Sequence, residues 1–158
     1  MFGYMKEHRK ELDELDKKLL EELVRNSKRS YRTLAKDLDM SPAAIIERVR
    51  TLEKTGYITG YGCRLDYQGL GFEFMAIVDI SISGRDLIGV EKRIAKMPRV
   101  AAIYDTTGQY DAIAILMCKN RNELSATVKK ILATPGVEKT NTNIVLNVMK
   151  RLTEFYEV

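Results

Sequence analysis

Basic and hydroxyl side chains gather in residues 28–54, where they could hold the phosphates of a nucleic acid. This segment contains seven Lys or Arg residues and four Asp or Glu residues, a local excess of three positive charges. The candidates for phosphate contacts are Ser41, through its hydroxyl, and the cationic residues Arg32, Arg48, Arg50 and Lys54. Phosphate contacts position a protein on a duplex but carry no sequence information. A solvated charged surface contains the same residue types, so the charges alone leave both interpretations open.

A second group of polar residues lies between two apolar runs and consists of Thr107, Gly108, Gln109, Tyr110 and Asp111. The backbone N–H of Gly108 is open to a carboxylate group, and the carboxylate of Asp111 can accept a hydrogen bond from an ammonium group. The loop could therefore bind a small molecule that carries both groups. The alternative is an ordinary hairpin in which Gly108 makes the turn and Asp111 caps it, and the residues alone favour this hairpin.

Two short helices joined by a tight turn are predicted over residues 30–58, and they would position the first group. Ser41 is a suitable N-cap, Pro42 suits the first helical position, and Gly56 supplies a C-terminal stop. The residues predicted to face inward are Leu34, Ala35, Leu38, Ile45, Val49 and Leu52, with Met40 in the turn. Helices this short need a third, and residues 12–23 offer a stripe of leucines at helical spacing. Three helices around one small core indicate a helix-turn-helix DNA-binding domain.

The second helix of such a motif lies in the major groove with its first residues toward the base edges. The outward residues near its start are Pro42, Ala43, Ala44, Ile46 and Glu47. Ala43, Ala44 and Ile46 can only touch thymine methyl groups or shape the fit. Glu47 could accept a hydrogen bond from a cytosine amino group, or it could pair with Arg48 or Arg50. Because few of these side chains can hydrogen-bond to bases, we expect sequence specificity to depend partly on DNA bending.

The composition is that of an ordinary globular protein with room for one domain or two small ones. The 158 residues are 45% hydrophobic and 30% charged, with a net charge of +4, which favours a polyanionic partner. No run reaches transmembrane length and no signal-peptide pattern opens the chain, so no membrane partner is predicted. Cys63 and Cys118 are predicted to be free thiols in a cytoplasmic protein. His8 is the only histidine, which argues against most hydrolases and metalloenzymes, and neither a metal nor a cofactor is predicted.

The second half of the chain predicts the order strand, helix, strand, strand, helix, strand. Residues 58–71 are interpreted as a short strand followed by a hinge. The expected strands are residues 72–83, 100–106, 112–118 and 137–149, and the helices are residues 87–97 and 124–131. An internal repeat supports this order, because IAKMPRVAAIYDTT and ILATPGVEKTNTNI align at an offset of 37 residues. Duplicated β-α-β units give a ferredoxin-like sheet with both helices on one face.

Apolar residues occupy both faces of several predicted strands. In residues 112–118 both parities are apolar, and near the chain end Ile144, Leu146 and Val148 oppose Val145 and Met149. An antiparallel sheet with one solvated face should alternate with polar residues. Because helices are available for one face only, a second copy of the sheet is predicted on the other, and hence a homodimer. The alternative is that the strands curl around one large core.

Three sequence patterns, taken together, resemble the Lrp/AsnC (feast/famine) transcription regulators. They are the Ser-x-x-x-Ile-x-x-Arg-Val-x-x-Leu-Glu helix that starts at Ser41, the Gly-Tyr-Ile-x-Gly-Tyr exit that starts at Gly56, and the Gly-x-Tyr-Asp loop at Gly108. The resemblance covers nearly the whole chain, from Leu15 to about Leu152. One departure lies in the hinge, where Tyr67 follows Asp66 and the family often carries a proline.

The resemblance implies an α+β fold with an N-terminal helix-turn-helix (winged-helix-like) domain and a C-terminal ferredoxin-like βαββαβ domain. The expected boundaries are residues 1–60 for DNA binding, 61–71 for the hinge, and 72–158 for ligand sensing and oligomerisation. It also implies a homodimer, often assembled into tetramers or octamers, that binds pseudo-palindromic double-stranded promoter DNA and senses an amino acid.

The same resemblance favours ligand contact for the loop over the plain hairpin. The expected effector-binding residues are Gly108, Gln109, Tyr110 and Asp111, with Asp105, Thr140 and Thr142 as further candidates. Asp105 would suit a cationic side chain such as that of lysine or arginine, and Gln109 would suit an amide. A polar or basic amino acid is therefore the expected effector.

Two other functions fit the same two-domain plan. Some relatives coat or wrap DNA without an effector, in the manner of chromatin. Haem-pathway decarboxylases resemble the architecture as well, but His8 is the only histidine here and no acid–base pair is evident. The chain is therefore predicted not to be an enzyme.

Overall fold

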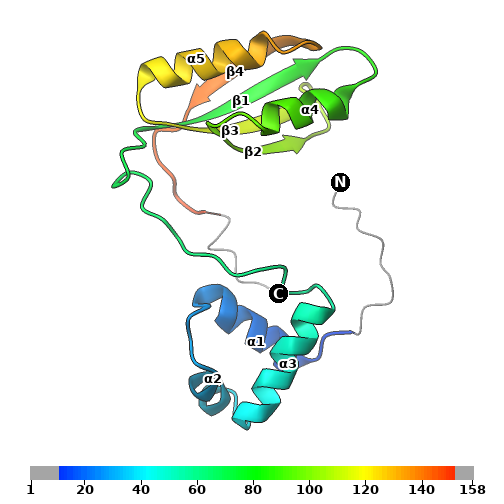
Figure 1. The fold of residues 1–158 in the computed structure, drawn as a ribbon, viewed down its shortest axis with the longest axis vertical. Coiled ribbons are helices and arrows are strands. Elements are labelled where there is room, and N and C mark those ends of the chain that lie inside the picture. The colour runs from blue at the N-terminus through cyan, green and yellow to red at the C-terminus, as the bar shows by residue number, and fades with distance from the viewer. Residues whose placement is uncertain (1–10, 152–158) are drawn as a thin grey trace. The chain divides into compact units, whose positions relative to one another are not determined.

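The computed structural model describes residues 11–151, which form two compact units, one ending at Leu65 and the other running from Asp66 to Val148 (Figure 1). Each unit is a self-contained structure and is described by itself. His8, which the sequence analysis singled out, lies outside the described residues. No helix among residues 11–151 is long and apolar enough to cross a membrane.

The first unit consists of three helices, α1 (Glu14–Arg25), α2 (Tyr31–Asp37) and α3 (Pro42–Lys54). Asp13 caps α1 in a capping box with Asp16, Ser30 caps α2, and Ser41 caps α3 with Pro42 at its first position. Gly56 follows α3 with a φ of 72°, a conformation that glycine adopts without strain. The two predicted helices of the motif and the helix before them are confirmed.

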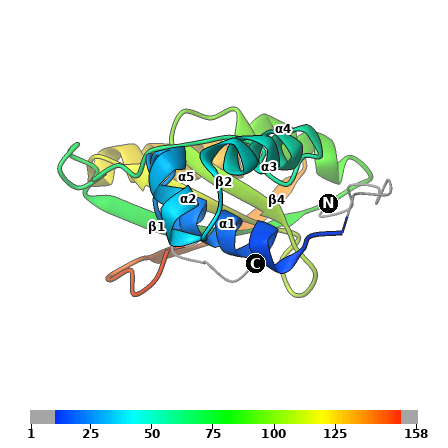
Figure 2. The same cartoon turned by 90° about the horizontal axis from the view of Figure 1, so that it is seen from below.

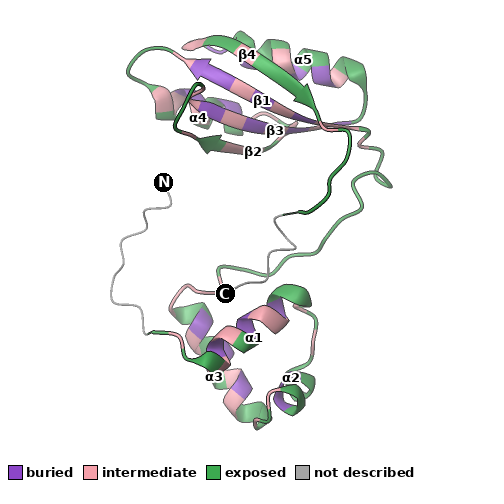
Figure 3. Ribbon diagram, turned by 180° about the vertical axis from the view of Figure 1, so that it is seen from behind, coloured by how far each residue is buried: buried purple, intermediate pink, exposed green. Residues whose placement is uncertain are grey.

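A small apolar core holds these three helices together (Figure 3). Its buried members are Leu19, Leu20, Leu23, Leu34, Ala35, Ile45, Val49 and Leu52, with Leu12, Leu38, Met40, Tyr57 and Ile58 partly buried against them. The N–H groups of Tyr57 and Ile58 both donate to the carbonyl of Leu52, at 2.9 and 3.1 Å, which turns the chain sharply after α3. Nearly the whole predicted stripe is therefore in the core.

The second unit has the order β1 (Phe74–Ile82), α4 (Leu87–Ala95), β2 (Val100–Asp105), β3 (Ala112–Cys118), α5 (Arg121–Leu132) and β4 (Val137–Ile144). The strands lie in the order β2-β3-β1-β4, and every neighbouring pair is antiparallel. This arrangement is the predicted ferredoxin-like βαββαβ sheet, so the fold class is confirmed.

Helices α4 and α5 lie on the same face of the sheet (Figures 1 and 2). The core beneath them is formed by alternate residues of β1 and β3 together with the inner faces of the helices. Its buried members are Ala76, Val78, Ile80, Val90, Ile94, Ala112, Ala114, Leu116, Cys118, Leu124 and Ile131. The described cysteines are both free, Cys118 in this core and Cys63 exposed in the first unit, as predicted.

The opposite face of the sheet carries apolar residues that no helix of this unit's described residues covers. Met75 lies opposite Met117 and Ile77 opposite Ile115 in the β1–β3 register, and all four are partly exposed. One carboxylate interrupts this face: Asp79 accepts hydrogen bonds from the side-chain amides of Asn141 and Asn143, at 3.0 and 3.1 Å. The two apolar faces predicted for the central strands are confirmed.

Two predicted strand segments are wrong. The last strand ends at Ile144 rather than continuing to residue 149, and Leu146 beyond it is 89% exposed. Residues 58–73 contain no strand; they include a turn closed by the N–H of Leu70 on the carbonyl of Asp66, at 3.0 Å. In both segments the apolar pattern suits a strand. After β4 only the N–H of Val145 still donates to β1, at 2.9 Å to the carbonyl of Met75, because β1 begins at Phe74; residues 58–73 have no neighbouring strand in the described chain.

Candidate DNA interface and effector loop

Helix α3 presents an exposed stripe on the side opposite its buried residues. Ala43, Glu47, Arg50 and Lys54 are all exposed. At about 100° per residue they fall on one side of the helix, while Ile45, Val49 and Leu52 fall on the other. Among the described residues, Glu47, Arg50 and Lys54 form no ion pair, so the alternative of a Glu47–Arg50 or Glu47–Arg48 pair is not realised. The stripe therefore offers two unpaired cations and one unpaired carboxylate to a partner.

The other predicted DNA-contacting residues surround the start of this stripe. The Ser41 hydroxyl accepts the N–H of Ala44 at 3.1 Å and still has its own proton to donate. Ala44 and Ile46 flank the stripe and are half-buried, so they expose only part of their side chains. Arg32 is exposed on α2 and forms no ion pair with another described residue.

Arg48 differs from the other residues predicted to contact phosphates, because its guanidinium is bound within the unit. Its Nη1 donates to Asp13 Oδ2 at 2.7 Å and to Asp16 Oδ1 at 2.6 Å. Asp16 is only 6% exposed. The hydrogen bond from the Asp16 N–H, followed by that from Arg48, lowers the pKa of Asp13, and the two carboxylates raise the pKa of Arg48. Arg48 therefore joins α3 to the start of α1 instead of extending the exposed stripe.

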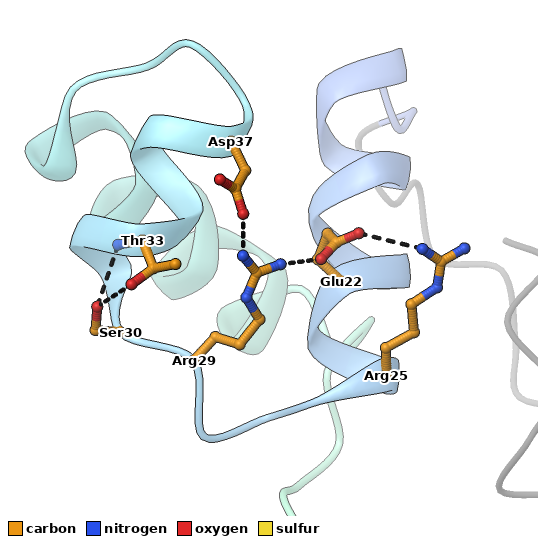
Figure 4. A network of polar contacts seen from close by, with 6 residues as sticks. All are labelled: Glu22, Arg25, Arg29, Ser30, Thr33 and Asp37. Carbon is orange, nitrogen blue, oxygen red and sulfur yellow. Dashed lines mark hydrogen bonds and ion pairs between the residues drawn. The ribbon is translucent and has the colours of Figure 1, made fainter.

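A second ion-pair network joins α1 to α2 (Figure 4). Arg29 reaches both Glu22 on α1 and Asp37 on α2, and Arg25 adds a contact of 3.3 Å to Glu22. Ser30 accepts the N–H of Thr33 at 3.1 Å. The ion pairs of Arg29 could not be predicted from the sequence, because its partners lie seven and eight residues away along the chain, beyond the spacing of pairs within one helix.

The chain leaving α3 is fastened to the helical unit at two points. The hydroxyl of Tyr61 donates to Glu53 Oε1 on α3 at 2.7 Å, and Nη2 of Arg64 donates to the carbonyl of Arg25 at 3.0 Å. Burial, and then the bond to Glu53, raises the pKa of Tyr61 to about 12. The Tyr61 hydroxyl therefore stays a proton donor throughout the physiological range.

The predicted effector loop joins β2 to β3 as a closed hairpin. The N–H of Thr106 donates to the carbonyl of Asp111 at 2.9 Å, and the Thr106 hydroxyl donates to the carbonyl of Tyr110 at 3.1 Å. Gly108, with a φ of 128°, and Gln109 are exposed at the tip. Tyr110 is half-buried, and Nζ of Lys139 lies 5.5 Å from its ring centre.

Asp111 fixes this loop to the neighbouring strand. Its Oδ2 accepts the N–H of Ile82 at 2.7 Å, and its own N–H donates to the carbonyl of Ile80 at 3.0 Å. This is the capping role that the plain hairpin interpretation gave to Asp111. A carboxylate has two oxygens, so Oδ1 remains able to accept from a ligand.

The strand register brings Thr140 and Asp105, two of the further effector-binding candidates, to the same end of the sheet as the loop. Thr140 lies opposite Ile80, Ile80 opposite Ala112, and Ala112 opposite Asp105, so one row across the sheet joins Thr140 to Asp105. Thr142 lies two rows further along, opposite Val78, and is exposed.

Glu91 on α4 belongs to this end of the sheet and was missed by the sequence analysis. Burial raises the pKa of its carboxyl, and the charges of Asp105 and Asp111 raise it further. Its Oε1 is buried without a hydrogen-bond partner among the described residues. Three carboxyl groups therefore add their negative potential here. Within residues 11–151 no group of three or more His, Cys, Asp or Glu side chains is arranged to hold a metal ion.

The two units and their surfaces are those of a DNA-binding transcriptional regulator, and comparisons with known proteins identify the family. The AsnC-type helix-turn-helix domain matches residues 12–53, and the Lrp/AsnC ligand binding domain matches residues 75–155. The chain belongs to the Lrp/AsnC family.

Individual relatives agree with this assignment. An uncharacterised HTH-type transcriptional regulator of Pyrococcus horikoshii is 42% identical over 140 residues, which are 89% of this chain and 95% of the relative. The structure of Escherichia coli AsnC has a TM-score of 0.83 and 28% identity over 91% of this chain and 99% of that one. The transcriptional regulator NMB0573 of Neisseria meningitidis has the same fold, with a TM-score of 0.86 and 24% identity over 92% of this chain and 96% of that one.

Proposed function

We propose that this protein is a sequence-specific transcriptional regulator that binds pseudo-palindromic promoter DNA as a homodimer and responds to an amino acid. The observation that carries the proposal is the exposed stripe on α3, where Arg50 and Lys54 form no ion pair with described residues and lie opposite the buried face of the helix. Such a helix face is complementary to a major groove flanked by phosphates.

On the DNA, Arg32, Ser41, Arg50 and Lys54 would contact phosphates. Ala43, Ala44 and Ile46 would lie against base edges and thymine methyl groups, and Glu47 would accept from a cytosine amino group. Arg48 is left out of the proposed phosphate-contacting set because it lies away from the exposed stripe and its Nη1 donates to Asp13 and Asp16. Because few side chains would contact base edges directly, discrimination between DNA sequences would depend partly on how readily the operator bends.

The effector is proposed to be a polar or basic amino acid bound at the end of the sheet near Gly108, Gln109 and Tyr110. The negative potential of Asp105, Asp111 and Glu91 supports a ligand with an ammonium group or a cationic side chain. The exposed Gly108 offers its N–H to the ligand's carboxylate, and Thr140 lies on the row that joins β4 to Asp105. The Neisseria protein was solved as a complex with L-Met, which supports an amino acid ligand for this fold.

The open face of the sheet is proposed to pair two copies. Met75, Ile77, Ile115 and Met117 are partly exposed apolar residues, and a second copy would remove them from water. An isologous contact of two sheets would also bring two helical units into one dimer, one for each half-site of a pseudo-palindrome. Further association into tetramers or octamers remains part of the proposal, as does action in the cytoplasm.

A second function, effector-independent DNA organisation, is favoured by one observation. Asp111 already accepts the N–H of Ile82, so the loop is a stable hairpin without any ligand. Enzymatic activity is not proposed, since the relatives are named as transcriptional regulators.

The test combines DNA retardation with calorimetry. The purified protein should retard a fragment of its own promoter at low salt in preference to a shuffled fragment of the same length, and calorimetry should detect heat with at least one of the twenty amino acids. Sequence-indifferent retardation without heat from any amino acid would favour the DNA-organising function. No retardation of either fragment would exclude both functions.

A further inference from the structure

Arg48 lies on a side of α3 that does not face the proposed duplex. Taking the direction of Ala43 as reference, Arg50 and Lys54 lie within about 20° of it, whereas Arg48 lies about 140° away. Its side chain is 25% exposed and sits beside the buried Ile45 and Val49 stripe. A side chain placed there is directed toward α1 rather than toward the exposed stripe.

The partners of Arg48 are the two carboxylates that begin α1, and each divides its oxygens between two tasks. Asp13 Oδ1 accepts the N–H of Asp16 at 2.7 Å, while Asp13 Oδ2 accepts from Arg48. Asp16 Oδ2 accepts the N–H of Asp13 at 3.3 Å, while Asp16 Oδ1 accepts from Arg48. Both hydrogens of Nη1 and all four oxygens thus have a partner. The capping box of α1 and the hydrogen bonds from Arg48 on α3 therefore form one polar network.

This network supplies a directional constraint that the core lacks. The core contribution of α3 is three aliphatic residues, Ile45, Val49 and Leu52. Apolar packing is non-directional, and aliphatic cores keep their stability more easily than their uniqueness. Charge-assisted hydrogen bonds are both shorter and more dependent on angle. Arg48, in the middle of α3, makes two such bonds to the capped start of α1. These bonds restrict how α3 rotates and tilts against α1.

We propose that Arg48, through Asp13 and Asp16, is a positioning residue that sets the orientation of α3 and thereby the discrimination between operator and other DNA. This inference rests on the proposed function, since it concerns how the proposed recognition helix is presented. It separates two roles on one helix: Arg50 attracts any duplex, and Arg48 determines which duplex the helix fits.

The experiment compares Arg48→Met with Arg50→Met in the full-length protein. Binding is measured, over a range of salt concentrations, to a duplex selected from random sequence by the wild-type protein and to a shuffled duplex. R48M should lower the ratio of the two affinities about tenfold and leave the salt dependence on shuffled DNA unchanged. R50M, the matched control on the same helix, should weaken binding to both duplexes and reduce the salt slope by about one.

Two milder variants keep the proposal open to refutation if R48M does not fold. Arg48→Lys retains a donor for both carboxylates and should restore most of the ratio. Asp13→Asn retains an oxygen for the cap of α1 but removes the charge facing Arg48, and it should lower the ratio about threefold with the salt slope unchanged. A loss of slope in R48M, or an unchanged ratio in both R48M and D13N, would overturn the proposal.

A structural measurement separates failure of this proposal from failure of the proposed function. Crystal structures of the wild-type and D13N proteins should differ in the angle between α1 and α3 by more than independent copies of one protein do. If the wild-type protein selects no sequence, the proposed function fails, and the angle then tests whether Arg48 sets the orientation of α3. An unchanged angle would contradict it.

Discussion

The helical unit and the sheet unit differ in what holds their functional surfaces in place. Of the eight ion-pair contacts formed among the described residues, six lie in the helical unit and two in the sheet unit. The helical unit has a small core and fixes its helices to one another with Arg29 and Arg48. The sheet unit has a larger apolar core and fixes its loop through backbone hydrogen bonds and the side chains of Thr106 and Asp111, without an ion pair between described residues.

This difference concerns the proposed partners of each unit. A surface that meets DNA must keep some cations free, and the helical unit does so by pairing Arg29 and Arg48 internally while leaving Arg50 and Lys54 exposed. A surface that meets a second copy needs apolar residues in register, and the β1–β3 pairs supply them. We therefore expect DNA binding by the helical unit to depend on salt concentration. We expect the stability and self-association of the sheet unit to depend on apolar packing.

The largest effect is expected from a cavity in the sheet core. Leu116 is 0% exposed, and Leu116→Ala should lower the free energy of unfolding by about 2–5 kcal/mol. Urea unfolding at low and high salt should give the same loss, because no charge is involved. Leu146→Ala, at a position 89% exposed, is the control and should change the stability by less than about 0.5 kcal/mol. Similar losses for the two variants would contradict the packing assigned to β3.

The next effect concerns the open face of the sheet. Ile115→Asp places a charge among Ile77, Met75 and Met117, and a second copy could cover it only at a high desolvation cost. Dimerisation should weaken at least about a hundredfold in sedimentation experiments. Ile88→Asp, at an exposed position on α4, should leave the association unchanged. A dimer of wild-type affinity in the Ile115 variant would exclude this face as the proposed interface.

A smaller effect is expected from the exposed cation on α3. Arg50→Ala should weaken binding to all duplexes about equally and reduce the slope of log affinity against log salt by about one. Fluorescence anisotropy with labelled duplexes from low to moderate salt provides the slope. Unchanged affinity and slope would show that Arg50 contacts no phosphate.

The smallest effect concerns Glu91, whose pKa is raised above its ordinary value of 4.5 by burial and by Asp105 and Asp111. A carboxyl with a raised pKa favours folding when protonated, so its stabilisation is present below pH 4.5 and is lost as the pH rises through the folded-state pKa. Glu91→Gln should therefore raise the thermal midpoint slightly at pH 7 and not at pH 4. Glu138→Gln, an exposed position on β4, should show no such pH dependence.

Much of the fold follows from local patterns in the sequence. Ser41, Pro42 and Gly56 mark both ends of α3, and the order of strands and helices in the second unit follows from hydrophobic patterns within each element. These signals depend only on residues close in the chain. The end of β4 and the segment 58–71 could not be predicted in this way, because a strand exists only where a neighbour pairs with it.

The candidate site was predictable only where it depends on one element. Helical geometry alone places Arg48 well away from Ala43 and Arg50, so its position outside the stripe could have been inferred. Its partner Asp13 lies 35 residues away along the chain, and no local pattern predicts that contact. The bond from Ile82 to Asp111 and the potential around Glu91 depend in the same way on strand register and helix packing.

The most direct test of the account is retardation of a promoter fragment at low salt by the wild-type protein and by Ala43→Glu. Ala43 is exposed in the first turn of α3, where a glutamate is compatible with the helix dipole, so the variant should fold with an unchanged thermal midpoint. The account predicts that the wild-type protein retards the fragment and that the folded variant does not. Equal retardation by the two proteins would contradict the placement of the α3 stripe against the duplex.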